Sequence, residues 1–208
     1  MGDITLLTYA MGLSSILVVL TGLVTAILLL IRYSRTRNPA VLGVMFLILS
    51  MGLTWIGTSI SFFLVLAGED PLGADAYALL TLTPLSFIGP LLVLTTMQML
   101  NFKKKMSVVL AIMIIFAGAC LFAAYTQTED VYEEYKIHEE SGLGEGSYAG
   151  VVQYTIAVYI LFTLLFMTPL YIFVCTKTES SQIRMKTGLL ALGYGFFGFF
   201  AIFDGLFT

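Results

Sequence analysis

The sequence predicts an all-α fold, a polytopic transmembrane helical bundle of six spans that forms a single domain over residues 1–208. Of its residues 59% are apolar and only 11% are charged, whereas about 25% of a soluble domain is charged. Six apolar stretches reach the roughly 20 residues that a bilayer core requires. They cover about 4–31, 40–67, 76–101, 106–126, 149–175 and 187–207. Open sheet edges do not face lipid and alternating strand patterns are missing from these stretches, so helices are the expected spans.

The charged residues lie in the connectors and at the tips, and they separate by sign. If the N-terminus is outside, nine of the ten basic residues fall inside: Arg32, Arg35, Arg37, Lys103, Lys104, Lys105, Lys177, Arg184 and Lys186. Twelve of the thirteen acids then fall outside: Asp3, Glu69, Asp70, Asp75, Glu129, Asp130, Glu133, Glu134, Glu139, Glu140, Glu145 and Asp204. Only Lys136 and Glu179 are exceptions. Because basic residues in short loops set orientation, we expect a plasma-membrane protein with acidic loops and both termini outside and basic loops in the cytoplasm.

The connectors explain where the helices end. The first helix runs into IRYSRTRNPA, which places Arg32 and Tyr33 at the inner headgroups. Asn38 and Pro39 then open the second helix, since proline is well tolerated in a first helical turn. Residues 67–75 form a short outer turn, and 101–107 and 176–186 form basic inner connectors.

The acidic segment 127–148 is the one substantial element expected outside the membrane. Its acids and apolar residues favour a short helix over about 128–140, followed by a flexible return at Gly142, Gly144 and Gly146. The tyrosines that flank and interrupt it suit an interfacial belt: Tyr125, Tyr132, Tyr135 and Tyr148. Two interpretations stay open, a solvated acidic cap and a cation-attracting or partner-docking surface.

The second span carries a polar stripe, formed by Ser50, Thr54, Thr58 and Ser61, whose spacing puts them on one helical face. Trp55, the only tryptophan, lies beside the stripe in mid-span. The hydroxyls predict either hydrogen bonds between helices, each worth about 0.6–2 kcal/mol, or one wall of a polar cavity.

Two prolines six residues apart mark the third span. Each removes a backbone donor and tends to kink a helix, and the freed carbonyls need other partners. The kink predicts either a static packing feature or a small cavity beside the polar stripe. The candidate cavity comprises Ser50, Thr54, Trp55, Thr58, Ser61, Thr81, Thr83, Pro84, Ser86 and Pro90. In the fifth span Pro169 follows Thr168 and marks a further possible hinge.

Small residues in the sixth span predict a helix-packing face, formed by Gly188, Ala191, Gly195 and Gly198. The segment GYGFFG, 193–198, matches a nucleotide-binding spacing, but it lacks the strand and βαβ unit which that motif needs. Cys120 and Cys175 lie in different leaflets, so we do not expect a disulfide between them.

The spans contain few ionisable residues that could catalyse a reaction or bind an ion. No Lys, Arg, His or Glu lies within them, and Asp204 is near the outer end of the sixth. Buried ionisable residues usually mark proton relays and ion paths, so their absence argues against a proton-coupled pump. The single histidine, His138, lies in the outer loop, which disfavours haem ligation and histidine metal sites. We therefore expect no enzymatic activity, no cofactor, no metal and no nucleic-acid partner.

The pattern across nearly the whole chain resembles the N-terminal membrane-sensing region of seven-helix membrane histidine kinases and related receptors. The residues that carry it are the arginine-rich first inner loop and mid-span Trp of RYSRTRNPAVLGVMFLILSMGLTW (32–55), the proline-bearing third helix, FKKK (102–105) and SSQIRMK before the sixth helix. The resemblance implies a sensing role. That family has a seventh helix and cytoplasmic signalling domains, whereas six spans are found here, so either the chain is a fragment or it signals through partners.

Three functions follow as hypotheses. The first is a non-enzymatic membrane module that senses or docks a partner. The second is an accessory or structural subunit of a larger membrane complex, and the third is a small transporter or channel component. The expected partners are the lipid bilayer and another membrane protein or a second copy of the chain; no small-molecule ligand is identified.

Overall fold

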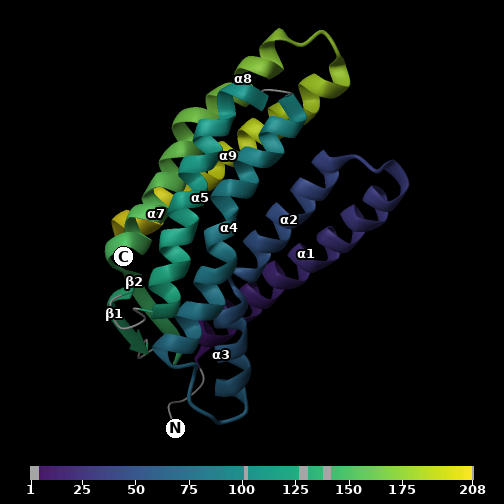
Figure 1. The fold of residues 1–208 in the computed structure, drawn as a ribbon. Coiled ribbons are helices and arrows are strands. Elements are labelled where there is room, and N and C mark those ends of the chain that lie inside the picture. The colour runs from purple at the N-terminus through teal and green to yellow at the C-terminus, as the bar shows by residue number, and fades with distance from the viewer. Residues whose placement is uncertain (1–4, 101–102, 127–130, 138–141, 208) are drawn as a thin grey trace. The chain divides into compact units, whose positions relative to one another are not determined.

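A computed structural model of the chain describes residues 5–100, 103–126, 131–137 and 142–207. The chain divides into two compact units, Met1–Val152 and Gln153–Thr208, and each is described by itself. Helices dominate both units (Figure 1). Among the described residues, five helical segments are long and apolar enough to cross a membrane: Leu6–Thr36, Pro39–Leu66, Ala74–Leu100, Met106–Thr126 and Gly150–Lys177. The protein is therefore a helical integral membrane protein, and its environment is the lipid bilayer.

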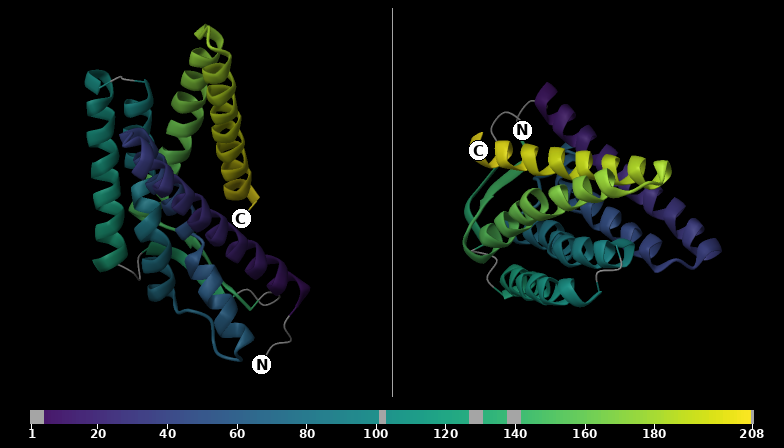
Figure 2. Two further views of the ribbon diagram at one scale, coloured as in Figure 1. Left: turned by 90° about the vertical axis from the view of Figure 1, so that its right-hand side faces the viewer. Right: turned by 90° about the horizontal axis from the view of Figure 1, so that it is seen from above.

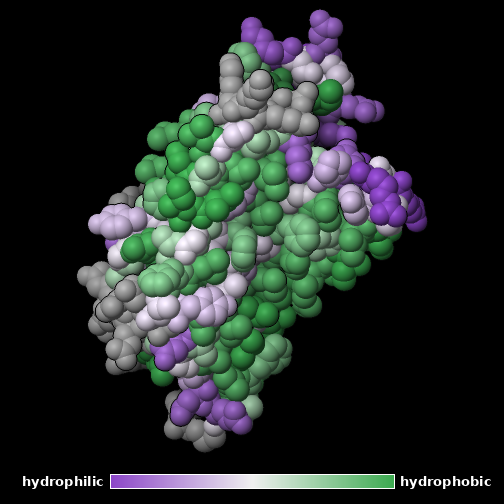
Figure 3. Space-filling model, viewed as in Figure 1, coloured by the Kyte–Doolittle hydropathy of each residue, from purple (hydrophilic) through white to green (hydrophobic). Residues whose placement is uncertain are grey.

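The first unit begins with α1 (Leu6–Thr36) and α2 (Pro39–Leu53), which pack side by side. The turn between them follows from its sequence. Arg37 adopts a left-handed conformation with φ of 52°, and the Asn38 side chain accepts a hydrogen bond from the Ala40 N–H. Pro39 occupies the first turn of α2, as predicted. On the face that Figure 3 shows, both helices carry mainly apolar surface, and hydrophilic residues gather at this turn.

The second span is broken. After α2 the chain makes a turn at Thr54 and Trp55 and then continues as α3 (Ile56–Leu66). The third span, α4 (Ala74–Leu100), is one helix through both Pro84 and Pro90. It packs against α2, α3 and α5 (Lys103–Thr126).

The outer segment corrects the expected short helix over 128–140. Within its described part, β1 (Tyr132–Ile137) and β2 (Gly144–Tyr148) pair as an antiparallel hairpin, with Tyr132 opposite Tyr148 and Ile137 opposite Gly144. Tyrosine and isoleucine favour strands. Of the glycines expected to form a flexible return, Gly144 and Gly146 belong to the second strand, and Gly142, with a φ of 66°, precedes it. Val131 and Leu143, both almost fully buried, anchor the hairpin. Glu129, Asp130, His138 and Ser141 lie outside the described residues.

The second unit contains most of the fifth span and α9. The fifth span comprises α7 (Gly150–Phe162), a π-helical turn η1 (Thr163–Met167) and α8 (Thr168–Lys177). The Thr168 N–H reaches back five residues to the Thr163 carbonyl, directly before Pro169. This irregular turn lies at the position where Pro169 predicted a hinge. α9 (Ser181–Phe207) covers the sixth expected span and packs against α8, as two further views show (Figure 2).

Candidate functional site

The break in the second span is the centre of the candidate site. The backbone N–H of Trp55 donates to the Gly52 carbonyl, three residues back, rather than to the Met51 carbonyl, four residues back. The hydroxyl of Thr54 donates to the Met51 carbonyl instead, at 2.7 Å. The helical geometry is thus interrupted at Trp55, with φ of -94° and ψ of 4°, whereas Thr54 keeps helical dihedral angles. A side-chain oxygen takes over part of the backbone hydrogen bonding. Ser50 remains within α2, and its carbonyl accepts from the Thr54 N–H.

After the break, the hydroxyl side chains of α3 form hydrogen bonds with neighbouring elements. Thr58 Oγ1 and the Tyr77 hydroxyl of α4 are 2.9 Å apart. Ser59 donates to Ser15 Oγ of α1 at 3.1 Å, and Ser61 accepts from the Leu72 N–H in the outer turn. All three α3 hydroxyl residues are buried. Thr58 and Ser61 of the polar stripe therefore tie α3 to α4 and to the outer turn, and Ser59, which is not part of the stripe, ties α3 to α1.

The candidate cavity residues of α4 do not all face the stripe. Thr83 Oγ1 lies 3.3 Å from the Tyr125 hydroxyl of α5. Ser86 donates to the Leu82 carbonyl and also bonds the thiol of Cys120 on α5. Only Thr81 of the α4 hydroxyls in the predicted set lies against α3. Thr83 and Ser86 therefore contact α5, whereas Thr58 and Thr81 lie between α3 and α4. Trp55 is half exposed.

Buried polar atoms without a hydrogen-bond partner lie where α4 meets glycines of the second span. Within the described part of the chain they are Thr81 Oγ1, Thr95 Oγ1 and Gln98 Oε1. A Cβ built on Gly57 would be 2.9 Å from Thr81 Oγ1, and one on Gly43 would be 2.8 Å from Thr95 Oγ1. The two contacts are about four helical turns apart on both antiparallel partners. Hydroxyl oxygens therefore face glycine Cα–H groups here, a weak contact that recurs at helix interfaces.

Sequence reasoning missed the small-residue face of α1. Its buried residues are Thr8, Gly12, Ser15, Gly22 and Ala26, all of them small and recurring at helical spacing. A Cβ on Gly22 would be 3.0 Å from the Cα of Gly52, so α1 and α2 touch backbone to backbone. A Cβ on Gly12 would overlap the ring of Phe62. The spacing was readable in the sequence as a small-residue motif.

In the second unit, the predicted face of α9 lies partly against α8. A Cβ on Gly188 would meet Cys175 Sγ at 3.4 Å, and one on Gly195 would meet Thr168 at 3.6 Å. Ala191 is buried, and the surroundings of Gly198 lie outside the description. Both cysteines are free, as predicted, and the Cys175 thiol donates to the Arg184 carbonyl.

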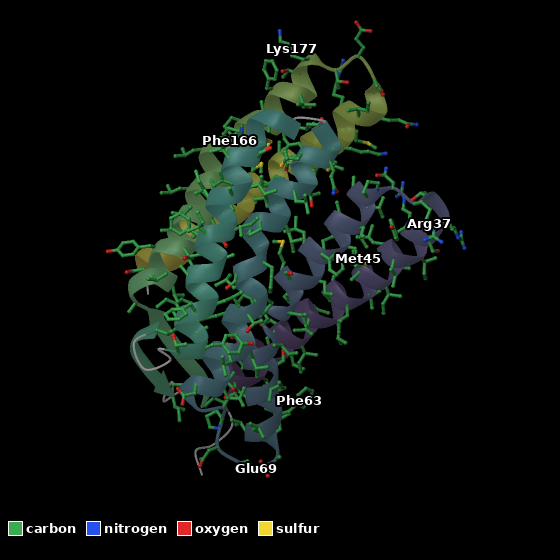
Figure 4. The ribbon with its side chains drawn as sticks, viewed as in Figure 1. Arg37, Met45, Phe63, Glu69, Phe166 and Lys177 are labelled. Carbon is green, nitrogen blue, oxygen red and sulfur yellow. The ribbon has the colours of Figure 1, made fainter. Side chains whose placement is uncertain are left out.

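Arg37 and Glu69 lie at opposite ends of the first helices (Figure 4). Figure 4 places Arg37 at the α1–α2 turn and Glu69 at the other end of the second span, with Met45 and Phe63 between them. Among the described residues, no group of three His, Cys, Asp or Glu side chains could hold a metal ion. The groups brought together between the helices are neutral hydroxyls, amides and a thiol, which bind by donating and accepting hydrogen bonds.

Comparison with protein-family models, curated proteins and solved structures finds no match to this chain.

Proposed function

We propose that this chain is a non-enzymatic membrane module that senses or docks another membrane protein. The observation that carries the proposal is the hydrogen bonding of the three hydroxyl side chains of α3. Thr58, Ser59 and Ser61 each have a hydrogen-bond partner on a neighbouring element of their own chain. Hydroxyls that bond in this way hold helices together and are not free to coordinate a passing solute.

In this proposal the partner protein, and not this chain, carries the catalytic or signalling activity. The spans offer hydroxyls, amides and aromatic rings, and the proposal needs no titratable group within the bilayer. The resemblance of 32–55 and the basic connectors to the sensing regions of membrane histidine kinases supports a signalling partner. A permanent subunit role in a larger complex uses the same surfaces, and the lifetime of the complex separates the two.

Purification of the full chain from its native membrane in mild detergent tests this proposal. Quantitative mass spectrometry is expected to find one other membrane protein at a fixed ratio to this chain, in two detergents of different class. A chain that purifies without any partner at a constant ratio contradicts the proposal.

Six spans with both termini outside in the plasma membrane form part of the same proposal, supported by the sorted charges. Glu69→Cys and Arg35→Cys test it as a matched pair, since both positions are exposed and lie at opposite ends of the first helices. An impermeant thiol reagent on intact cells should label Glu69→Cys and leave Arg35→Cys unlabelled. The reverse pattern rejects the orientation.

A small transporter component is the second candidate, and the break at Thr54 and Trp55 favours it. Broken helices form substrate sites at mid-depth in many transporters, where half-helix ends face the solute. Flux through liposomes that contain the purified chain separates the candidates. Solute flux above that of empty liposomes supports transport, and its abolition by Thr58→Leu would place the path at α3.

A further inference from the structure

Three arginines at the α1–α2 turn have no anionic partner in the described part of the chain. Arg32, Arg35 and Arg37 are all exposed, and the side chain of none of them forms an ion pair or a hydrogen bond with a described residue. The next acids in the sequence, Asp3 and Glu69, are separated from this turn by the whole of α1 and of the second span. The turn therefore carries three positive charges that no described residue neutralises.

These charges begin where the apolar surface of α1 ends. Val24, Leu28 and Ile31 are 55%, 61% and 47% exposed, and Arg32 follows directly in the same helix. Arg32 and Arg35 come four and seven residues after Leu28, so they continue the same face of the helix. One stripe of α1 is therefore exposed and apolar up to Ile31 and exposed and cationic beyond it.

The length of the cationic part matches the headgroup layer of a bilayer. From Arg32 to Thr36, the last residue of α1, the helix rises about 6 Å. The polar layer on each side of a bilayer is about 5–8 Å thick. Figure 3 shows hydrophilic surface at this turn beside the apolar surface of the helices. When the apolar part of the stripe lies among acyl chains, the guanidinium groups thus lie at the depth of the lipid phosphates.

The same end of the first unit carries further basic residues. A Cβ on Gly43, near the start of α2, would be 3.1 Å from Gln98 Oε1, near the end of α4. α5 begins shortly after this point with Lys103, Lys104 and Lys105. The three arginines and the three lysines therefore belong to one end of the unit. Clusters of about four to eight basic residues beside a membrane span are typical of anionic-lipid binding.

We propose that the exposed stripe of α1 binds an anionic phospholipid. Its acyl chains lie along Leu28 and Ile31, and its headgroup phosphate accepts hydrogen bonds from the guanidinium groups of Arg32 and Arg35. Arginine suits this ligand because its planar fork donates two parallel hydrogen bonds to a phosphate. The net negative charge of the lipid neutralises the turn, which a zwitterionic lipid does not do. The inference goes beyond the proposed function, since it needs no protein partner.

Lipid binding by the purified full chain tests the proposal. The chain is freed of lipid in detergent and titrated with phosphatidylglycerol, or with phosphatidylcholine as the zwitterionic control, and native mass spectrometry measures the bound lipid. Phosphatidylglycerol is expected to bind more tightly. Equal affinities for the two lipids overturn the proposal.

Removal of two charges locates the site. The double variant Arg32→Gln, Arg35→Gln is expected to bind phosphatidylglycerol about thirtyfold more weakly, since each basic residue at a membrane surface strengthens this attraction about fivefold. Lys177→Gln with Lys186→Gln is the matched control, because it removes two exposed charges from a different connector. It should leave the affinity nearly unchanged, and far-ultraviolet circular dichroism checks that both double variants stay helical. Equal losses of affinity in the two double variants overturn the proposal.

Other occupants of the turn appear as distinct outcomes. Inorganic phosphate at the concentration of the lipid should not displace phosphatidylglycerol, because it lacks acyl chains to lie along Leu28 and Ile31. Displacement under these conditions overturns a lipid site. If Arg32→Gln with Arg35→Gln leaves lipid binding unchanged and releases a co-purifying protein, the arginines hold an acidic segment of that protein, and the lipid proposal is overturned while the docking function is kept.

Discussion

Replacement of Gly12 by alanine tests whether the small-residue face of α1 sets the packing of the first unit. A Cβ at this position would overlap Cγ and Cδ2 of Phe62. That ring is 2% exposed, and it packs edge-on against Tyr9 with ring centroids 6.0 Å apart. The ring therefore has no open space to enter, and α1 or α3 must shift to admit the methyl group.

The expected magnitude follows from two opposing terms. Over-packing of a core costs about 1–3 kcal/mol, while alanine is favoured over glycine within a helix by about 1 kcal/mol. We expect Gly12→Ala to lower the free energy of unfolding by up to about 2 kcal/mol. Gly118→Ala on α5 is the matched control, because nothing lies within 4 Å of its Cβ. It should leave the free energy of unfolding unchanged or raise it by up to about 1 kcal/mol.

Unfolding of the purified chain in mixed micelles, followed by circular dichroism, measures both variants under identical conditions. Phe62→Leu supplies a shorter side chain, so Gly12→Ala should cost less in that background than in the parent. If Gly12→Ala and Gly118→Ala change the free energy of unfolding by the same amount, the close packing of α1 on Phe62 is refuted.

Three further predictions concern single contacts. Ser59→Ala should lower the free energy of unfolding by about 0.6–1.7 kcal/mol because it removes the bond to α1. Ser14→Ala removes only a bond to its own helix and should change the free energy of unfolding by no more than about 0.5 kcal/mol. An equal loss of stability in both variants contradicts the interhelical bond. A small maleimide should label the half-buried Cys175 in the folded protein and reach the buried Cys120 only after unfolding, so rapid labelling of both in the folded state counts against the packing of α5. Pro169→Ala restores a backbone donor and should return the π turn before it to α-helix, and unchanged backbone chemical shifts there in nuclear magnetic resonance would show that proline is not its cause.

The ends of the spans could be predicted because they depend on local chemistry. Apolar length fixed the approximate ranges, and Asn38 and Pro39 begin α2 as their capping and ring geometry require. The effect of the two prolines on their helix could not be predicted in this way. α4 stays one helix through Pro84 and Pro90, while the second span, which has no proline after Pro39, breaks at Thr54 and Trp55. Packing against neighbouring helices decides whether a helix breaks at such a position. The conformational preferences of single residues do not predict that packing.

The hairpin and the contacts of Thr83 and Ser86 could not be predicted, for different reasons. The acids before Tyr135 favoured a helix on composition, but strand preference and an antiparallel partner across Gly142 prevailed. The cavity set assumed that Thr83 and Ser86 share a face with the polar stripe. Helix rotation directs both toward α5 instead, and a sequence without a known partner helix does not reveal that rotation.

Cysteine accessibility tests most directly whether the hydroxyls of α3 hold helices together rather than line a water-filled path. Ser59→Cys and Ser61→Cys preserve side-chain size at two buried positions, and Glu69→Cys in the exposed outer turn is the control. With a small water-soluble thiosulfonate reagent and the chain in liposomes, we expect rapid reaction at Glu69→Cys and none at Ser59→Cys or Ser61→Cys. Reaction at Ser59→Cys or Ser61→Cys at a rate near that of Glu69→Cys would contradict the account and favour a transport path through α3.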